Sequence, residues 1–242
     1  MEIVPIGDSA LIVRLRDRFE DAPDKTLDSV LRAVAQIQAA TIPGVIEFAP
    51  AYTSVSVFYN PIAIAKSAEN MEAPFEWLAA RIRLTLDSPG AVCKIARQQA
   101  PIVEIPVCYD LEFALDIDDV ARSANMSPQE VITLHSAAEY RVACIGFVPG
   151  FTFLAGLPKA LSTPRRNIPR KQIPPGSVGI GGAQTGIYPL RSPGGWNLIG
   201  RTPLRLFDPL KNPPTLLRVG ERVRFRTISR DEFQAWCIEK EP

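Results

Sequence analysis

The sequence has few of the residues that build metal centres and redox sites. Its 242 residues include a single histidine, His135, and four cysteines at positions 93, 108, 144 and 237. No two cysteines form a C-x-x-C pair, so their spacing predicts no metal site. Scattered thiols are typical of a reducing compartment, and we expect a cytoplasmic protein. A nucleophilic pair of Cys144 with His135 stays open as an alternative, although neither residue lies in a recognisable activating context.

Long apolar runs and a large net charge are also missing. No run approaches the ~20 apolar residues that cross a bilayer, so we expect no membrane-spanning helix. The first residues, MEIVPIGDSALIV, carry Glu2 and Asp8 where a signal peptide has basic residues. The net charge of +1 argues against a general nucleic-acid binder. We therefore expect a globular protein with neither membrane nor nucleic acid as its partner.

One long stretch lacks acidic residues altogether. Residues 140–207 contain 11 of the 15 glycines and nine basic residues, but no Asp or Glu. The whole chain carries 26 acidic and 27 basic residues, so the imbalance is local. A positive field of this kind favours an anionic ligand, a carboxylate or a phosphate, over a cation or a metal.

The first 90 residues predict a small α+β sandwich domain. Apolar residues alternate in four segments and recur at helical spacing in two others. The predicted strands are 3–6, 10–15, 45–48 and 54–59, and the predicted helices are 27–40 and 73–86. We expect Asp24 or Thr26 to cap the first helix. The order strand, strand, helix, repeated once, is typical of an α+β domain that covers residues 1–90.

Residues 91–242 predict a second domain built mainly from short strands. A strand at 102–109 leads into helices at 116–125 and 127–138, the second with a capping box of Ser127 and Glu130. Short apolar pieces then alternate with proline and glycine, which indicates an antiparallel barrel or sandwich. The further strands are 141–145, 177–180, 187–190, 197–201, 204–207 and 221–228, and a last helix covers 231–239.

Three clusters in this second domain are candidates for a binding site. Residues 146–154 contain a Gly-Pro-Gly turn among phenylalanines, which suits either a pocket wall or a tight turn between core strands. The proline-bounded segment 164–171 offers arginines for a carboxylate or phosphate, or forms a solvated basic loop. Residues 181–196 combine glycine-rich turns with neutral polar groups, either for an amide ligand or as hairpins anchored by Trp196. No Gly-Lys-Ser/Thr follows, so this is not a Walker A loop.

These clusters supply no catalytic base and no carboxylate for magnesium. Amide hydrolysis or the use of Mg-ATP would therefore need an acid from elsewhere in the chain or from another polypeptide. The candidates within the chain are Asp8, Glu47, Asp110 and Glu139. We favour the second alternative and predict an obligate partner.

Three motifs carry a resemblance to a known family: IGFVPGFTFLAGLP at 145–158, TPRRNIPRKQIPPGSVGIGG at 163–182 and QTGIYPLRSPGGWNLIGRTP at 184–203. Together with PIGDSALIV and AYTSVSVFYNP in the first domain, they resemble the family of bacterial 5-oxoprolinase B subunits. That family also includes allophanate hydrolase subunit 1 and the Kip-type inhibitor of a sporulation sensor kinase. The resemblance implies an N-terminal α+β domain followed by a C-terminal cyclophilin-like β-barrel.

The resemblance also implies a function and a site. It indicates a protein that activates 5-oxoproline with ATP and magnesium, which a C-type partner binds or shares, before an A-type partner helps to open the lactam to glutamate. It places twelve residues near the pocket: His135, Tyr140, Phe147, Pro149, Gly150, Arg165, Arg166, Arg170, Gln184, Thr185, Tyr188 and Trp196.

Roles within that set are expectations. We assign Arg166 or Arg170 to the substrate carboxylate, Gln184 and Thr185 to the amide, and His135 to acid–base catalysis. A histidine at a helix edge, bonded to a neighbour, is the more ordinary alternative for His135.

Other functions fit the same motifs. A regulatory inhibitor of a sensor histidine kinase needs no catalytic base. A component of an allophanate hydrolase or urea amidolyase would process a smaller amide acid. Prolyl isomerisation is suggested only by the cyclophilin-like fold, which is a weak basis for a function.

Overall fold

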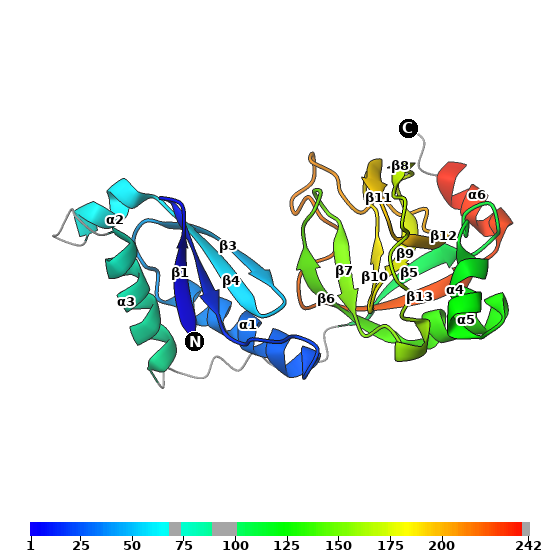
Figure 1. Ribbon diagram of the computed structural model, residues 1–242. Helices are drawn as coiled ribbons and strands as arrows, with labels where there is room; N and C mark the ends of the chain where they lie inside the picture. Colours follow the sequence, from blue (N-terminus) through cyan, green and yellow to red (C-terminus); the bar gives the residue numbers. More distant parts are fainter. Residues whose placement is uncertain (68–73, 89–100, 239–242) are drawn as a thin grey trace. The chain divides into compact units, whose positions relative to one another are not determined.

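The chain divides into two compact units, residues 1–99 and 100–242. The computed structural model describes residues 1–67, 74–88 and 101–238 (Figure 1). The predicted boundary between residues 90 and 91 falls within 89–100, outside the described residues, so its position stays a prediction. Position 73 of the second predicted helix and position 239 of the last one also lie outside them.

The first unit is an antiparallel sheet with helices packed against it (Figure 1). The strands pair in the order β1-β2-β4-β3, with β1 at Glu2–Ile6, β2 at Ala10–Arg14, β3 at Val45–Ala51 and β4 at Ser54–Tyr59. Helix α1 (Pro23–Ala39) packs against β3, β4 and α3 (Pro74–Asp87), and α2 (Pro61–Ser67) packs against α3. Alternate strand residues such as Leu11, Val13, Val55 and Val57 are fully buried and form the core with the helices.

Two details of this unit differ from the prediction. Helix α1 begins at Pro23, which suits a first helical position because proline has no amide proton to leave unpaired. The N-cap is Ala22 without a side-chain bond, so the predicted caps Asp24 and Thr26 are wrong and lie inside the first turn. The short helix α2 was not predicted, although Asn60 accepts hydrogen bonds from the amides of its first residues.

The second unit contains a closed barrel, which confirms the α+β class with a C-terminal β-barrel. Around the barrel the order is β10-β7-β6-β13-β5-β12-β9. The bounds are β5 Val103–Cys108, β6 Glu139–Ile145, β7 Thr152–Ala155, β9 Ser177–Gly181, β10 Gln184–Ile187, β12 Asn197–Arg201 and β13 Arg222–Ile228. A separate two-stranded sheet joins β8 (Arg170–Ile173) to β11 (Ser192–Gly194).

Helices pack against this barrel through short apolar faces. Helix α4 (Ile117–Ala124) packs against β12, α5 (Pro128–Ala137) against β13, and α6 (Arg230–Ile238) against β5, while the 3₁₀ helix η1 (Lys159–Leu161) packs against α4. The predicted capping box of α5 is confirmed: Ser127 Oγ accepts from the Glu130 amide, and the Ser127 amide donates to Glu130 Oε2 at 2.7 Å. In the three described ranges, no helix is long and apolar enough to span a bilayer.

The barrel is not purely antiparallel, which corrects the prediction. Strand β13 pairs in parallel with β5 and antiparallel with β6, so the first and last strands of the unit are neighbours and close the barrel. Alternation patterns report which pieces are strands but not which distant pieces pair. The predicted strand 204–207 is irregular apart from a bridge of Phe207 with Thr215, and the predicted strand 187–190 begins where β10 ends.

Candidate functional site

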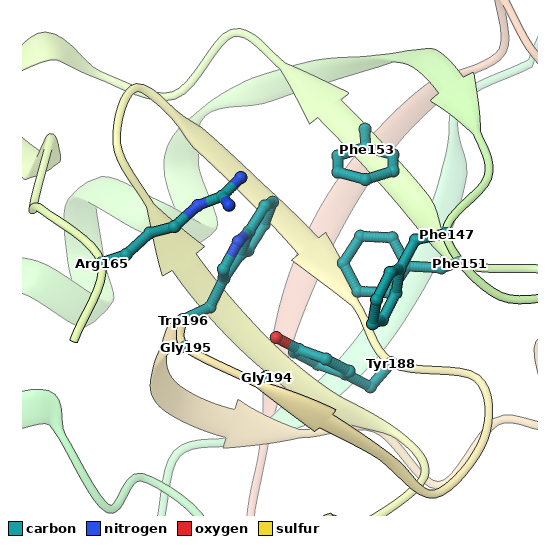
Figure 2. Close-up of a pocket in the computed structure, with 8 residues that line it drawn as sticks. All are labelled: Phe147, Phe151, Phe153, Arg165, Tyr188, Gly194, Gly195 and Trp196. Atoms are coloured by element: carbon teal, nitrogen blue, oxygen red, sulfur yellow. The ribbon is translucent and has the colours of Figure 1, made fainter. Parts of the chain in front are cut away.

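A pocket of about 110 Å³ lies on the barrel unit, where all three predicted clusters meet. Figure 2 shows its lining residues: Phe147 and Phe151 from the turn before β7, Phe153 on β7, Arg165 from the loop before β8, Tyr188 after β10, and Gly194, Gly195 and Trp196 between β11 and β12. Segments far apart in the sequence therefore build one concave site, which needs the closed barrel to hold them.

The aromatic lining is centred on the buried ring of Phe151. Its centroid lies 4.7 Å from Phe153, 4.9 Å from Tyr188, 5.5 Å from Trp196 and 5.6 Å from Phe147. The rings meet edge-to-face or tilted, and such pairs each contribute about 0.5–1.5 kcal/mol beyond the area they bury. This packing makes the apolar wall rigid and suits a flat ligand.

The turn before β7 holds Phe147 at the edge of the pocket. Backbone bonds close this turn, from Gly146 N to Phe151 O at 3.1 Å and from Phe151 N to Val148 O at 3.0 Å. Phe147 has a φ of +67°, a left-handed conformation that costs a bulky residue about 1–3 kcal/mol. Its ring is nevertheless 62% exposed, so burial in the core does not account for this conformation. Both interpretations of the cluster hold: it is a tight turn, and it forms a pocket wall.

Glycine at two positions leaves room for the pocket side chains. A Cβ atom on Gly194 would lie 2.4 Å from the hydroxyl oxygen of Tyr188, and one on Gly181 would lie 2.6 Å from the indole of Trp196. Both distances are far below van der Waals contact, so any other residue would displace these rings.

Two polar groups border the pocket. The exposed guanidinium of Arg165 lies over the ring of Trp196, with Cζ 5.9 Å from the ring centroid. Burial raises the pKa of Tyr188 to about 12, although a hydrogen bond from the Trp196 backbone amide and nearby arginines oppose the rise. The phenol therefore stays protonated and can donate. Together these groups can bind a carboxylate and a carbonyl oxygen.

Arg166 and Arg170 contact a buried protein carboxylate instead of lining the pocket. Arg170 donates to both oxygens of Asp116 at 2.7 and 2.9 Å, and Arg166 donates to the same carboxylate at 2.5 Å. The backbone amide of Leu198 adds a bond of 2.7 Å, and the Asp116 side chain is only 2% exposed. The assignment of Arg166 or Arg170 to the substrate carboxylate is therefore corrected, because Asp116 already occupies both guanidinium groups.

The four acids proposed to enter the site do not line it. Glu139 pairs with Arg222 through two bonds of 2.6 Å, which lower the pKa of that carboxyl, and Asp110 accepts from the Glu112 amide at 3.0 Å. Asp8 and Glu47 belong to the first unit. Within the described parts of the chain, the pocket lining contains no acidic residue.

His135 lies in the barrel core. It is fully buried, and its ring stacks on Phe225 with 4.5 Å between centroids. Its Nδ1 lies 2.8 Å from the Tyr109 hydroxyl and its Nε2 lies 3.0 Å from Thr185 Oγ1. Thr185 donates its single proton to the Gly179 carbonyl at 3.0 Å, so it accepts from Nε2–H, and Nδ1 accepts from Tyr109.

These bonds make His135 a neutral structural residue. Burial lowers its pKa to about 3, and both ring nitrogens are occupied. The predicted acid–base role is therefore wrong, and the alternative of a helix histidine bonded to its neighbours is confirmed. The pairing of Cys144 with His135 is wrong as well, because the ring is engaged elsewhere and burial raises the pKa of the Cys144 thiol.

Other predicted site residues also lie away from the pocket lining. Thr185 is held in the His135 network, and the buried Tyr140 donates to the His135 carbonyl at 2.7 Å, which corrects both substrate-binding assignments. Gln184 begins β10, and Pro149 and Gly150 form the turn behind Phe147. Phe147, Arg165, Tyr188 and Trp196 are the predicted residues that do line the pocket.

Sequence reasoning missed several residues of the site. Phe151, Phe153, Gly194 and Gly195 lie inside the quoted motifs, so their place in those motifs could have singled them out. Asp116 lies 50 residues before Arg166 at the start of α4, and no local pattern connects the two. In the part of the chain that the structure describes, no group of His, Cys, Asp or Glu side chains could hold a metal ion.

The fold and the site define an α+β protein whose β-barrel carries an aromatic pocket bordered by arginine. Residues 1–217 match the family described as carboxyltransferase domain, subdomain C and D, and the chain belongs to this family. It is 43% identical to the 5-oxoprolinase B subunit of Bacillus subtilis (strain 168) over 239 residues, which cover 98% of this chain and 97% of that protein.

Solved structures share the fold. The crystal structure of TTHA0988 is 34% identical in sequence, with a TM-score of 0.74, over 91% of this chain and 40% of that chain. This chain therefore spans less than half of TTHA0988. The Kluyveromyces lactis urea amidolyase is 19% identical with a TM-score of 0.71, over 96% of this chain and 15% of that chain, a likeness of fold alone.

Proposed function

We propose that this chain is the B subunit of an ATP-dependent 5-oxoprolinase and that its barrel pocket binds the lactam substrate. The observation that carries the proposal is 43% identity over 98% of the chain to a 5-oxoprolinase B subunit. The complex would convert 5-oxoproline, ATP and water to glutamate, ADP and phosphate, which makes it an amide hydrolase. The cytoplasmic location expected from the cysteines stays a prediction.

The pocket chemistry supports a small lactam acid. 5-Oxoproline has a nearly flat five-membered ring, one carboxylate and one ring amide. In our assignment the ring lies against Phe151 and Trp196, the carboxylate faces Arg165, and the ring carbonyl accepts from the Tyr188 hydroxyl. Hydrogen bonds to a charged group contribute about 1.5–3 kcal/mol, so the arginine contact dominates recognition.

Opening the lactam needs groups that this pocket does not provide. Hydrolysis needs a base, and Mg-ATP needs oxygen ligands from carboxylates. Among the described residues, the pocket lining contains neither an acid nor a histidine. We infer that a C-type partner binds or shares ATP and magnesium, that an A-type partner contributes to ring opening, and that this chain alone is inactive. The exposed Phe147 ring at the pocket edge supports contact with a partner there.

The proposal is tested by coupled ADP release from the chain alone and from the chain with its C-type and A-type partners. We expect 5-oxoproline-dependent release only from the complex. Arg165→Ala and Tyr188→Phe should each lower kcat/KM about tenfold or more, because each removes a bond to the substrate. The matched control is Arg191→Ala, an exposed arginine of the same basic stretch that bonds Gln172, and it should retain full activity.

The same assay separates the alternatives. Release with allophanate but not with 5-oxoproline would reassign the chain to an allophanate-type enzyme. Release by the chain alone would contradict the need for partners. No release with either substrate in the complete mixture would favour a regulatory protein.

A further inference from the structure

We propose that Asp116 is a positioning residue of the pocket, whose buried carboxylate ties the loop of Arg165 to the strand segment of Trp196 and so holds the Arg165 guanidinium over the pocket. The identity of the ligand rests on the proposed function. The geometry that supports Asp116 involves no ligand, so the two can fail separately.

Asp116 holds the Trp196 side of the pocket through β12. The Asp116 backbone amide donates to the Leu198 carbonyl at 2.9 Å, and the Leu198 amide donates back to Asp116 Oδ2 at 2.7 Å. Leu198 lies two residues after Trp196 and is nearly fully buried. This two-way contact fixes β12 against the start of α4, and with it the indole that forms one wall.

The same carboxylate holds the Arg165 side. Arg166 and Arg170 both donate to it, and they bracket a loop, residues 164–169, that has no regular helix or strand. Two further bonds join the sides directly, from Arg166 N to Gly195 O at 2.7 Å and from Asn197 Nδ2 to Pro164 O at 2.9 Å. The loop and the strand segment thus meet around one buried anion, next to Arg165.

Charge explains why no neighbour can replace Asp116. Two guanidinium groups share its carboxylate, and without that anion they would repel each other in a partly buried site. Asp119 is the other nearby acid, but it is half exposed, 3.9 Å from Arg166, and bonded to Arg122 at 2.9 Å. Removal of the Asp116 charge would therefore release the loop and move Arg165 away from Trp196.

A ligand-free experiment tests the positioning directly. In a chain with Trp77→Phe and Trp236→Phe, Trp196 is the one remaining tryptophan of the three. We expect Asp116→Asn to red-shift its emission and to raise acrylamide quenching several-fold, because the loop no longer covers a ring that is now 4% exposed. Asp119→Asn is the matched control and should change neither. Unchanged Trp196 quenching in a cooperatively folded Asp116→Asn variant would overturn the proposal.

A second measurement separates positioning from general damage. In the complex, Asp116→Asn should raise KM for 5-oxoproline about tenfold with a smaller change in kcat, and should leave inhibition by 2-pyrrolidinone, which lacks the carboxylate, unchanged. In an Arg165→Ala background, Asp116→Asn should add little, because both changes act through one guanidinium. Equal loss for both ligands, or full additivity, would show that Asp116 is merely structural.

Two contingencies keep the test decisive. If Asp116→Asn fails to fold, Arg170→Lys keeps the charge but loses the two-pronged contact, and should change Trp196 quenching in the same direction to a smaller extent; no change would contradict the proposal. If the wild-type complex shows no response to 5-oxoproline, the proposed function fails, while the Trp196 measurement still decides the role of Asp116.

Discussion

The barrel unit contains two buried polar clusters that differ in charge and in place. The cluster of Tyr109, His135 and Thr185 is neutral, and every proton has an acceptor inside the barrel core. The cluster of Asp116 with Arg166 and Arg170 is ionic and borders the pocket, and its arginine side chains are 31% and 23% exposed. Both consist of residue types that sequence reasoning assigns to substrate.

The difference shows where a fold uses each kind of bond. The neutral cluster joins α5 to strands whose backbone positions are already fixed by their ladders. The ionic cluster holds a loop with no ladder of its own, where a stronger and longer-ranged interaction is needed. Loss of charge should therefore have a larger effect at Asp116 than loss of a hydrogen bond at His135.

The largest effect is expected from Asp116→Ala. This change leaves two guanidinium groups and the Leu198 amide without their acceptor, and breaking a buried ion pair typically costs about 3–5 kcal/mol. Urea unfolding followed by Trp196 fluorescence, in the chain without the other two tryptophans, measures it. Asp119→Ala, at a half-exposed carboxylate, should stay within about 0.5 kcal/mol. A loss below about 1 kcal/mol at Asp116 would break the comparison.

A smaller effect is expected from Thr185→Val, which keeps the side-chain shape in the neutral cluster. It leaves His135 Nε2–H and the Gly179 carbonyl unpaired, at a cost of about 1–3 kcal/mol. The same unfolding measurement applies. Thr133→Val is the control, because this exposed threonine only bonds the Gln129 carbonyl in its own helix, and it should change stability by less than about 0.5 kcal/mol. A loss equal to that of Asp116→Ala would remove the distinction between the clusters.

The neutral cluster should also respond to pH. The folded His135 has a pKa near 3, below the ordinary 6.5, so the unfolded chain takes up this proton while the folded chain does not. Stability is full above pH 6.5 and falls as the pH drops toward 3, by about 1.4 kcal/mol per pH unit. Unfolding between pH 6.5 and 5 measures this slope before most carboxylates titrate. His135→Gln should flatten the slope, and an unchanged slope would contradict the assignment.

The smallest effect on stability is expected from Phe147→Gly at the pocket edge. Glycine adopts the positive φ without strain, and the lost ring is mostly exposed, so stability should change by no more than about 1 kcal/mol, in either direction. Thermal unfolding measures it. Phe151→Ala in the same turn removes a buried ring and should cost about 3 kcal/mol or more. A loss of that size at Phe147 would show that its ring belongs to the core.

Local structure was predictable where one segment contains the whole cause. The capping box of Ser127 and Glu130 needs only four residues, and the alternation at 54–59 identifies β4 without its neighbours. The parallel pairing of β5 with β13 was not predictable, because it joins strands more than 100 residues apart that share no pattern. The proline at the start of α1 was available in the sequence but was not used.

The site was predictable only in part, for the same physical reason. The motifs place Arg165, Tyr188 and Trp196 at the pocket because each lies in a loop that borders a strand. They cannot show that Arg166, the next residue in the chain, points to a buried acid. Whether a polar side chain faces a ligand or a partner inside the protein depends on distant segments, which residue type does not reveal.

The place of β13 in the barrel has a consequence for biosynthesis. This strand lies between β5 and β6, yet it ends at Ile228, after every residue that lines the pocket has been translated. A nascent chain on the ribosome therefore carries the pocket residues on an open sheet with exposed edges until the last strand emerges. Closure of the barrel, and with it a competent binding surface, becomes a post-translational event of the whole unit.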